Sequence, residues 1–317
     1  MIDMCESLDD ETLKMLEKKI MENHPNTYTF TKNLAEQLIL TKAKDLPIAI
    51  VRPSIICAAQ EEPFPGWVDN LSGITGMITA ISTGAARSVI CDSNLNLNVV
   101  PIDYVVDTLI CASWHSTMQH NNTIKVYNCT TSVETIRWGP AKDLISKYAV
   151  KWPSKDVMWY PGATFRTNKF MHNVMSSIQH ILPAFVGDFF LRLLGRKPIR
   201  AGPFRLMKIM ERFERAVRTY TFFSTQEWKF DRDNMDDLSK KVKALDDSSR
   251  FNTDMRDFDW DTYVCSYTLG IRKYILNETL ETLSKARRRL LILYWVHRLV
   301  QVLSIFILLA MIKLVVH

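Results

Sequence analysis

A helical stretch followed directly by a short β-branched strand, between residues 23 and 53, most constrains how this chain can fold. Asn23–Thr27 supplies helix-breaking residues and a helix-start signal, and residues 28–40 then repeat apolar side chains at helical spacing. Leu46–Pro53 is a short β-branched run that ends at a proline and is typical of a buried parallel strand. This order predicts one helix and one strand of a doubly wound α/β fold.

Tyr28 and Lys32 lie one turn apart on the expected helix and therefore share a face. A lysine ammonium held near a phenol favours the phenolate and lowers a pKa that is ordinarily about 10. Such a phenol can give a proton to a carbonyl oxygen as hydride arrives at the carbon. A tyrosine and a lysine at this spacing also occur on exposed helices without any chemistry, so the interpretation depends on the neighbouring motifs.

The neighbouring motifs are those of a known family. They are Pro25–Lys32, Ala35–Gln37, Val51–Ile56, Pro65–Asn70 and Val100–Asp107. Together they resemble the alcohol-forming fatty acyl-CoA reductases of the insect type, which are extended short-chain dehydrogenases/reductases, and the similarity covers essentially the whole chain. The resemblance implies two hydride transfers from NADPH, which take a long-chain fatty acyl-CoA through an aldehyde to a primary alcohol.

The resemblance also implies the roles of individual residues. Tyr28 would be the catalytic proton donor, and Lys32 would tune it and hold the nicotinamide ribose. The backbone around Pro53, Ser54 and Ile55 would line the cofactor pocket at the nicotinamide. Asp103 stands before the helical run 104–114 and is expected to be its N-cap rather than a catalytic acid.

The glycine-rich loop that holds the cofactor pyrophosphate in such enzymes cannot be found in this sequence. No two of the ten glycines are two positions apart, so G-x-G-x-x-G cannot be written. The wider T-G-x-x-G-x-x-G pattern fails too, because Thr79 stands where the third glycine would follow Gly73 and Gly76. Only 27 residues precede Tyr28. We therefore expect the N-terminal nucleotide-binding half to be missing, through a fragment or gene-model start rather than a short isoform.

Three regions are expected along the chain. Residues 1–132 would be the C-terminal half of a Rossmann-like reductase domain, with strands near 47–52, 97–101 and 124–129. A capping box at Thr131–Glu134 would open a mainly helical domain over 133–284. Residues 285–317 would be a basic flank and a membrane anchor. The loop over residues 60–70 follows the first strand, and a substrate lid and a plain turn are equally good interpretations of it.

The C-terminal tail is the second strong signal. Lys285–Arg289 is basic, and the 23 mostly apolar residues of Leu290–Ile312 are enough to cross about 30 Å of hydrocarbon. Arg298 weakens the pattern, so a tilted transmembrane helix and a deep interfacial helix both remain open, and we favour the first. The positive-inside rule then places the bulk of the chain in the cytosol, at the endoplasmic reticulum or a peroxisome. For a second apolar stretch, Ile178–Leu194, we favour core packing over an interfacial or acyl-tunnel segment.

Composition excludes several other classes of function. A net charge of +6, dispersed along the chain, does not indicate nucleic-acid binding. The six cysteines are scattered without a C-x-x-C pair, which indicates reduced thiols, and neither H-E-x-x-H nor a tight Cys/His cluster predicts a metal site. The expected partners are long-chain fatty acyl-CoA and membrane lipid. Two alternatives stay open: a catalytically inactive, membrane-tethered binding or scaffold protein, and an extended reductase that acts on sterols.

Overall fold

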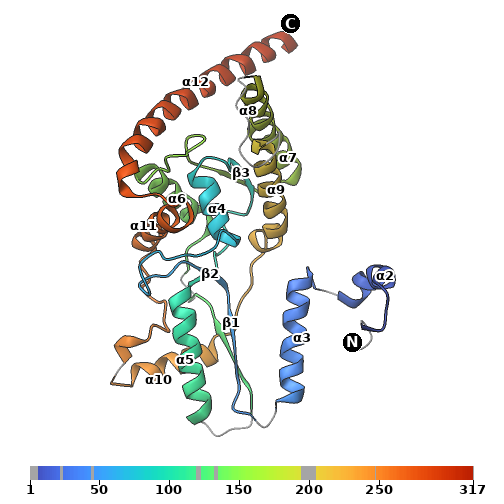
Figure 1. Ribbon diagram of the computed structural model, residues 1–317, viewed down its shortest axis with the longest axis vertical. Helices are drawn as coiled ribbons and strands as arrows, with labels where there is room; N and C mark the ends of the chain where they lie inside the picture. The colour runs from blue at the N-terminus through green and yellow to red at the C-terminus, as the bar shows by residue number, and fades with distance from the viewer. Residues whose placement is uncertain are drawn as a thin grey trace.

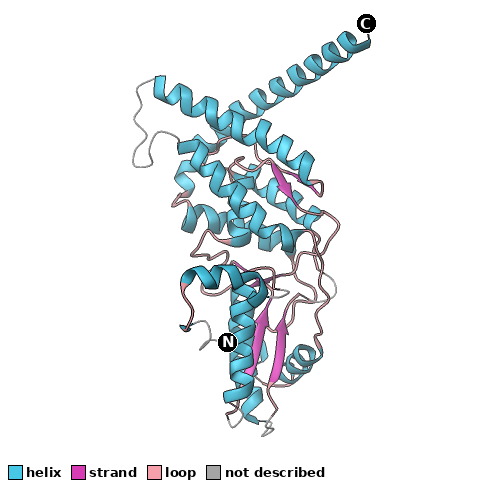
Figure 2. Ribbon diagram, turned by 90° about the vertical axis from the view of Figure 1, so that its right-hand side faces the viewer, coloured by secondary structure: helices cyan, strands magenta, loops and turns pink. Residues whose placement is uncertain are grey.

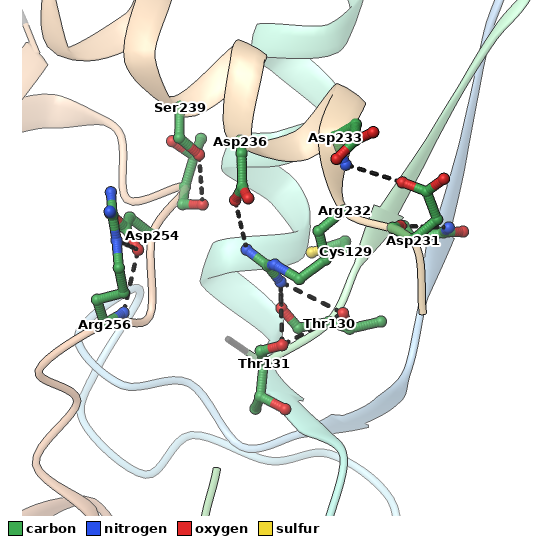
Figure 3. Close-up of polar contacts among 12 residues, drawn as sticks. Cys129, Thr130, Thr131, Asp231, Arg232, Asp233, Asp236, Ser239, Asp254 and Arg256 are labelled. Atoms are coloured by element: carbon green, nitrogen blue, oxygen red, sulfur yellow. Dashed lines mark hydrogen bonds and ion pairs between the residues drawn. The ribbon is translucent and has the colours of Figure 1, made fainter. Parts of the chain in front are cut away.

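We describe the fold from a computed structural model of the chain. It describes residues 6–21, 24–43, 46–118, 123–131, 135–193, 205–246 and 248–316. Figure 1 shows an elongated molecule with β1 between helices in its lower half, mainly helices in its upper half and the long helix α12 leaving at the top. Figure 2 shows the same arrangement from the side, with helices predominating and the strands confined to short stretches.

The helical elements differ widely in length. In chain order they are α2 (Asp10–Met21), α3 (Thr27–Lys42), α4 (Gly73–Ser82), α5 (Ile102–Met118), α6 (Trp138–Lys151), α7 (Lys169–Ser176), the π-helix η1 (Ser177–Ile181), α8 (Leu182–Leu193), α9 (Arg205–Ser224), α10 (Asp233–Lys243), the 3₁₀-helix η2 (Ser248–Arg250), α11 (Trp260–Gly270), the π-helix η3 (Ile271–Ile275), the 3₁₀-helix η4 (Leu280–Thr282) and α12 (Leu283–Val316). The strands are β1 (Ala49–Pro53), β2 (Ile55–Cys57), β3 (Ser88–Ile90), β4 (Val99–Pro101), β5 (Lys125–Cys129) and β6 (Thr164–Arg166).

The parallel sheet is built around β1 and β2, which only Ser54 separates. β1 pairs with β5, and β2 pairs with β4, both in parallel. The Ser54 amide donates to the Cys129 carbonyl oxygen at 3.0 Å, whereas the Ile55 amide donates to the Asn98 carbonyl oxygen at 3.2 Å. Neighbouring amides of a strand point to opposite sides, so this strand changes its partner at Ser54.

A small core lies between this sheet and the helices α5 and α10. Tyr127, which is opposite Val51 in the β1–β5 register, is fully buried with Cys111 of α5 and Leu238 of α10. Its hydroxyl forms a hydrogen bond of 2.7 Å with Nδ1 of His115. The strands expected near 47–52, 97–101 and 124–129 are thus confirmed as β1, β4 and β5, and the mixed α/β fold class is confirmed with them.

Helix α3 stands beside the sheet. None of its residues, all of which the structure describes, is buried, and Figure 1 shows α3 and α2 to one side of the remaining elements. An ion pair links α3 to β1, because Arg52 donates two hydrogen bonds to the Glu36 carboxylate. Leu38 and Leu40 of α3 are about half exposed, so this helix has apolar surface that the described residues do not cover.

The largest hydrophobic cluster lies above the sheet and joins α4, α6 and α11. Its buried members include Ile78 and Ile81 of α4, Ile145 and Tyr148 of α6, and Tyr267 of α11. The short parallel pair β3–β6 packs against the same cluster. Local sequence patterns did not predict these short strands or β2. Residues 132–134 of the predicted capping box lie outside the described residues.

The segments α7, η1 and α8 follow one another without a break and pack against α9. Their buried residues recur at every fourth position: His172, Ser176, His180, Ala184 and Asp188. The opposite side is exposed, so the expectation that Ile178–Leu194 is packed is right for one side of α8 and wrong for the other. The physical reason is the helical period, because one neighbouring helix covers only one side of α8.

Helix α12 begins against the helical domain and continues beyond it. Ala286 and Leu290 are buried, and the indole Nε1 of Trp159 donates to Nδ1 of His297 at 3.1 Å. From Leu299 onward, every large apolar side chain that the structure describes is more than a third exposed. Among the described residues, Leu280–Phe306 is a helix long and apolar enough to cross a membrane by length and composition.

Candidate active site

The first turn of α3 is held in place by side chains around Tyr28. Asn26 caps the helix, because its Oδ1 accepts from the Thr29 amide at 2.9 Å. Nε2 of His24 lies 2.9 Å from Nδ2 of Asn33, the residue after Lys32, and the His24 ring packs edge-on against Phe30. These contacts define where the helix begins, and with it the direction of the Tyr28 side chain.

Tyr28 and Lys32 lie together on the exposed surface of α3. The Lys32 ammonium is 5.7 Å from the centroid of the Tyr28 ring, and Tyr28 is 67% exposed. The phenol is therefore open to a ligand from outside the helix. The predicted neighbourhood of the two side chains is present, while their catalytic roles stay predictions.

One further residue of the same face connects the pair to the sheet. Glu36 lies one turn after Lys32, and its Oε1 accepts from Arg52 Nε at 2.8 Å. The hydrogen bonds from Arg52 hold the pKa of Glu36 below its ordinary value, and those same bonds raise the pKa of Arg52. Sequence reasoning did not single out either residue, although both lie within motifs that carry the family resemblance. The ion pair fixes which side of α3 faces β1.

The predicted cofactor residues Pro53, Ser54 and Ile55 lie where β1 passes into β2. The backbone amides of Ser54 and Ile55 are used within the sheet, as described above. The Ser54 hydroxyl is buried and has no hydrogen-bond partner among the described residues. A buried hydroxyl without a partner costs about 1–3 kcal/mol, so a ligand group that bonded to it would be favoured. Pro53 is exposed beside it.

Asp103 corrects one expectation from the sequence. Helix α5 already begins at Ile102, so Asp103 is not its N-cap. Its carboxylate instead accepts from the backbone amides of Gln60 at 3.0 Å, Glu61 at 2.9 Å and Glu62 at 3.3 Å. Asp103 thus clamps the loop that follows β2. No local pattern could have predicted this, since the partners are more than 40 positions away.

The loop over residues 60–70 is a fixed turn in this structure rather than an open lid. The amides of Ala59 and Gly66 bond to carbonyl oxygens across the turn, at 3.0 and 2.9 Å. Gly66 has a φ of +76° and lies so close to α11 that a Cβ atom there would be 2.1 Å from the Ser266 carbonyl oxygen. The turn therefore ties the end of β2 to the helical domain.

A cavity of about 310 Å³ lies between β1 and α5, at the other end of the strand. Its lining includes Pro47, Ile48, Leu109 and Ser113. Ligands of open parallel sheets bind beyond the carboxyl ends of the strands. Because this cavity is at the amino end of β1, we do not assign the cofactor or the substrate to it.

Within the described residues, no group of three or more His, Cys, Asp or Glu side chains could hold a metal ion. Cys57, Cys91, Cys111 and Cys129 are buried free thiols, and Cys265 is partly buried. Burial raises the pKa of the Cys57 thiol to about 12 and that of the Cys111 thiol to about 11. These thiols are therefore protonated and poorly reactive near neutral pH.

The fold and the position of these residues agree with comparisons to known families. Two family models, an NAD-binding domain and a Sterile domain, match residues 2–109 and 179–278, and both are described as Male sterility protein. Tyr28, Lys32 and the residues 53–55 all fall within the first match. Residues 2–109 are thus similar to a nicotinamide-binding domain.

The most similar relatives define the family more closely. Fatty acyl-CoA reductase 1 of Rattus norvegicus is 35% identical over 291 residues, which cover 92% of this chain and 55% of the relative. Fatty acyl-CoA reductase 2 of Mus musculus is 33% identical over 299 residues, 94% of this chain and 57% of the relative. The chain belongs to the fatty acyl-CoA reductase family. It spans about half the length of the curated relatives it matches.

The residues present fit one end of a nicotinamide dinucleotide. The buried Ser54 hydroxyl without a partner and the exposed Tyr28 and Lys32 would suit the nicotinamide and its ribose. The pyrophosphate requires a glycine-rich turn at a helix N-terminus, and the ten glycines of this sequence do not form that pattern. The fit is therefore restricted to the nicotinamide end.

Proposed function

We propose that this chain carries the catalytic and membrane-attached part of an NADPH-dependent fatty acyl-CoA reductase, which forms a primary alcohol through an aldehyde. The observation that carries the proposal is the exposed Tyr28–Lys32 pair on a helix fastened to β1 by the Glu36–Arg52 ion pair. The names of the relatives support a fatty acyl-CoA as the substrate. The NAD-binding family model supports a nicotinamide cofactor.

Tyr28 is the proton donor in this proposal. The Tyr28 phenol would give its proton to the substrate carbonyl oxygen, where negative charge develops, while a nicotinamide bound there would supply hydride to the carbonyl carbon. The Lys32 ammonium stabilises the resulting phenolate and binds the nicotinamide ribose. The Ser54 hydroxyl would hold the nicotinamide, and a hydrogen bond to it would give this buried group a partner.

Two such reductions complete the conversion. In the first, hydride and proton add across the thioester carbonyl, and the C–S bond of the product then breaks to release coenzyme A as its thiol and an aldehyde. In the second, hydride and proton add across the aldehyde carbonyl to give the alcohol. Each reduction would require one hydride from the nicotinamide, and Tyr28 would take up a proton from solvent between them.

Helix α12 is the membrane anchor in this proposal. Its first part is held by the helical domain through Leu290 and His297, so we assign the span to the 18 residues of Leu299–Val316. At 1.5 Å per residue these cover about 27 Å, close to the thickness of a hydrocarbon core. The basic residues Arg287–Arg289 then lie on the cytosolic side, at an endoplasmic-reticulum or peroxisomal membrane.

The experiment that tests this function uses a chimera, because the chain spans about half of its relatives. The part of the rat fatty acyl-CoA reductase 1 that precedes its match is joined to residues 1–317 and reconstituted in vesicles. Incubated with NADPH and a long-chain acyl-CoA, the chimera should form the fatty alcohol, and a chimera with Tyr28→Phe should not. A parallel incubation with a ketosteroid tests the sterol alternative.

The outcomes separate the proposed function from its alternatives. A chimera that binds NADPH, as measured by fluorescence titration, but reduces neither substrate would contradict the proposal and favour an inactive, membrane-tethered binding protein. Reduction of the ketosteroid alone would favour the sterol reductase. Alcohol formation with NADH at the same rate as with NADPH would show that the enzyme does not prefer NADPH.

A further inference from the structure

The continuous helix α7–η1–α8 carries an apolar stripe that the described residues leave uncovered. Among its described side chains, the large apolar ones more than a third exposed are Phe170, Met171, Val174, Ile178, Ile181, Leu182, Phe185, Val186, Phe189 and Leu193. They recur every three or four positions, which aligns them on one side of the helix. The stripe runs from α7 to the end of α8, about 35 Å at 1.5 Å per residue. Uncovered apolar surface of this length marks an interaction site.

The opposite side of the same helix packs against α9. The carboxylate of Asp188 is buried and accepts from the amides of Leu206 at 3.1 Å and Met207 at 3.0 Å, so it caps the start of α9. His180 and Ser176 bond to Glu214 of α9. Ser176, His180 and Asp188, which would oppose burial in lipid, thus point toward α9, away from the stripe.

The described side chains of α8 and α9 include more exposed basic than exposed acidic residues. The exposed basic ones are Arg192, Lys208, Arg212, Arg215 and Arg218, whereas Glu211 is the exposed acidic one among these described side chains. The other two acidic residues, Asp188 and Glu214, are used inside the packing described above. The surface beside the apolar stripe is therefore basic. Apolar side chains flanked by basic ones are the pattern of helices that lie in anionic membrane interfaces.

The stripe lies at the same end of the molecule as the C-terminal part of α12. Figure 1 shows α8 at the upper end, near the height at which α12 leaves the domain. In α12, Leu299, Leu303 and Phe306 are at least half exposed. A bilayer that receives the end of α12 would therefore approach the end of the molecule that carries α8.

We propose that the α7–η1–α8 stripe is a second membrane contact, in which the helix lies in the headgroup–acyl boundary of an anionic bilayer while α12 crosses it. This inference rests on the proposed anchoring by α12. The stripe fixes the tilt of the helical domain on the bilayer, and the exposed basic residues of α8 and α9 bind acidic headgroups. A single helix leaves a domain free to rotate, whereas a helix lying in the interface removes that freedom.

The test uses the full chain in vesicles of phosphatidylcholine and phosphatidylserine. A nitrobenzoxadiazole fluorophore is attached at Phe185→Cys, with Cys5 and Cys265 replaced by Ser so that the remaining thiols are the buried ones. The matched control places the label at Asp143→Cys, whose side chain is 74% exposed on α6. We expect the label at 185 to shift to shorter wavelength and to be quenched by lipids with a nitroxide near the headgroup. The label at 143 should show neither effect.

Two further arms define the result that would overturn the inference. Replacing Ile178 and Phe189 by Glu should abolish the quenching at 185, and vesicles without phosphatidylserine should reduce it, while the circular dichroism stays unchanged. The absence of a wavelength shift for the label at 185 would overturn the inference. A shift without quenching by the nitroxide lipids would also overturn it, because it would indicate that a second copy or another protein covers the stripe. Retention in carbonate-washed vesicles is measured in parallel, because its loss would contradict the anchor rather than the stripe.

Discussion

The Arg52 guanidinium holds the Glu36 carboxylate with two hydrogen bonds, and this ion pair joins the helix of Tyr28 to the strand that ends beside Ser54. The two residues are 16 positions apart, and they lie on the helix and the strand that the family resemblance identified. Because Tyr28, Lys32 and Glu36 are separated by single turns, fixing Glu36 also fixes the direction of Tyr28 and Lys32.

Tyr28→Phe should abolish alcohol formation in the chimera without loosening the fold. The substitution removes only the phenol hydroxyl, and Tyr28 is 67% exposed, so thermal unfolding and NADPH binding should stay unchanged. A positioned acid contributes about 10²–10⁴-fold to rate. Turnover within about tenfold of the parent chimera would show that Tyr28 is not the proton donor.

Glu36→Gln should loosen α3 at neutral pH. Arg52 is 53% exposed, so the ion pair stabilises the docked helix by no more than about 1 kcal/mol. Hydrogen–deuterium exchange of the amides of α3 should become faster in Glu36→Gln and in Arg52→Gln. The exchanged pair Glu36→Arg with Arg52→Glu should restore much of the protection. If either single variant exchanges like the wild type, the ion pair does not dock α3.

The same pair predicts a dependence on pH. Because the pKa of Glu36 is lowered in the folded chain, its contribution is complete above the ordinary value of 4.5 and is lost as the pH falls through the lower folded value. The difference in α3 protection between wild type and Glu36→Gln should therefore be constant from pH 8 to pH 6 and disappear in strong acid. A difference that persists there would require another role for Glu36.

A buried histidine predicts a second pH effect, in the helical domain. His172 is buried between the Ser88 hydroxyl at 3.0 Å and the Glu214 carboxylate at 3.4 Å, with Arg166 and His180 nearby. Burial lowers its pKa from the ordinary 6.5, outweighing the opposing effect of Glu214. The unfolded chain thus binds a proton more readily, and stability falls as the pH drops below about 6.5.

The measurement for His172 is the melting temperature between pH 7.5 and pH 5. It should fall less steeply in His172→Gln, which keeps a polar side chain but cannot take up a proton in this range. His115, whose pKa is also lowered by burial, provides the comparison, because His115→Gln should flatten the same profile independently. Equal slopes in wild type and His172→Gln would show that His172 does not titrate on unfolding.

Gly270→Ala should destabilise the junction between the turn after β2 and α11. A Cβ atom on Gly270 would lie 1.7 Å from the Gly66 carbonyl oxygen, so the backbone must move. Overpacking of this kind typically costs about 1–3 kcal/mol. Gly187→Ala is the matched control, since its Cβ meets only the mobile end of Leu206 at 2.8 Å. Urea unfolding should show a clear loss for Gly270→Ala and little change for Gly187→Ala.

The sequence predicted the elements whose signals are local. The helix α3, the strands β1, β4 and β5, and the Tyr28–Lys32 face all follow from spacing within a few residues. It did not predict the Asp103 clamp or the contact of Gly66 with Gly270, because these join segments far apart in the chain. Short strands such as β3 offer too few residues for an alternating pattern to emerge. The exposed side of α8 was misjudged, since composition alone does not tell which side a neighbour covers.

The last prediction concerns the span. Deleting residues 299–317 should release the chain from carbonate-washed membranes, while the contacts of Leu290 and His297 with the helical domain remain. Leu303→Arg should weaken retention less, because a charged residue near mid-bilayer costs about 2.5–3.5 kcal/mol on the insertion scale.

Two tags distinguish a span from a helix lying on the surface. A glycosylation acceptor placed after His317 should be modified in endoplasmic-reticulum membranes, and one placed before Arg287 should not, because the positive-inside rule keeps the basic flank in the cytosol. Modification of neither acceptor, together with retention in carbonate, would indicate a deep interfacial helix. A truncated chain that still resists carbonate would mean that another segment, such as the exposed stripe of α8, supplies the attachment.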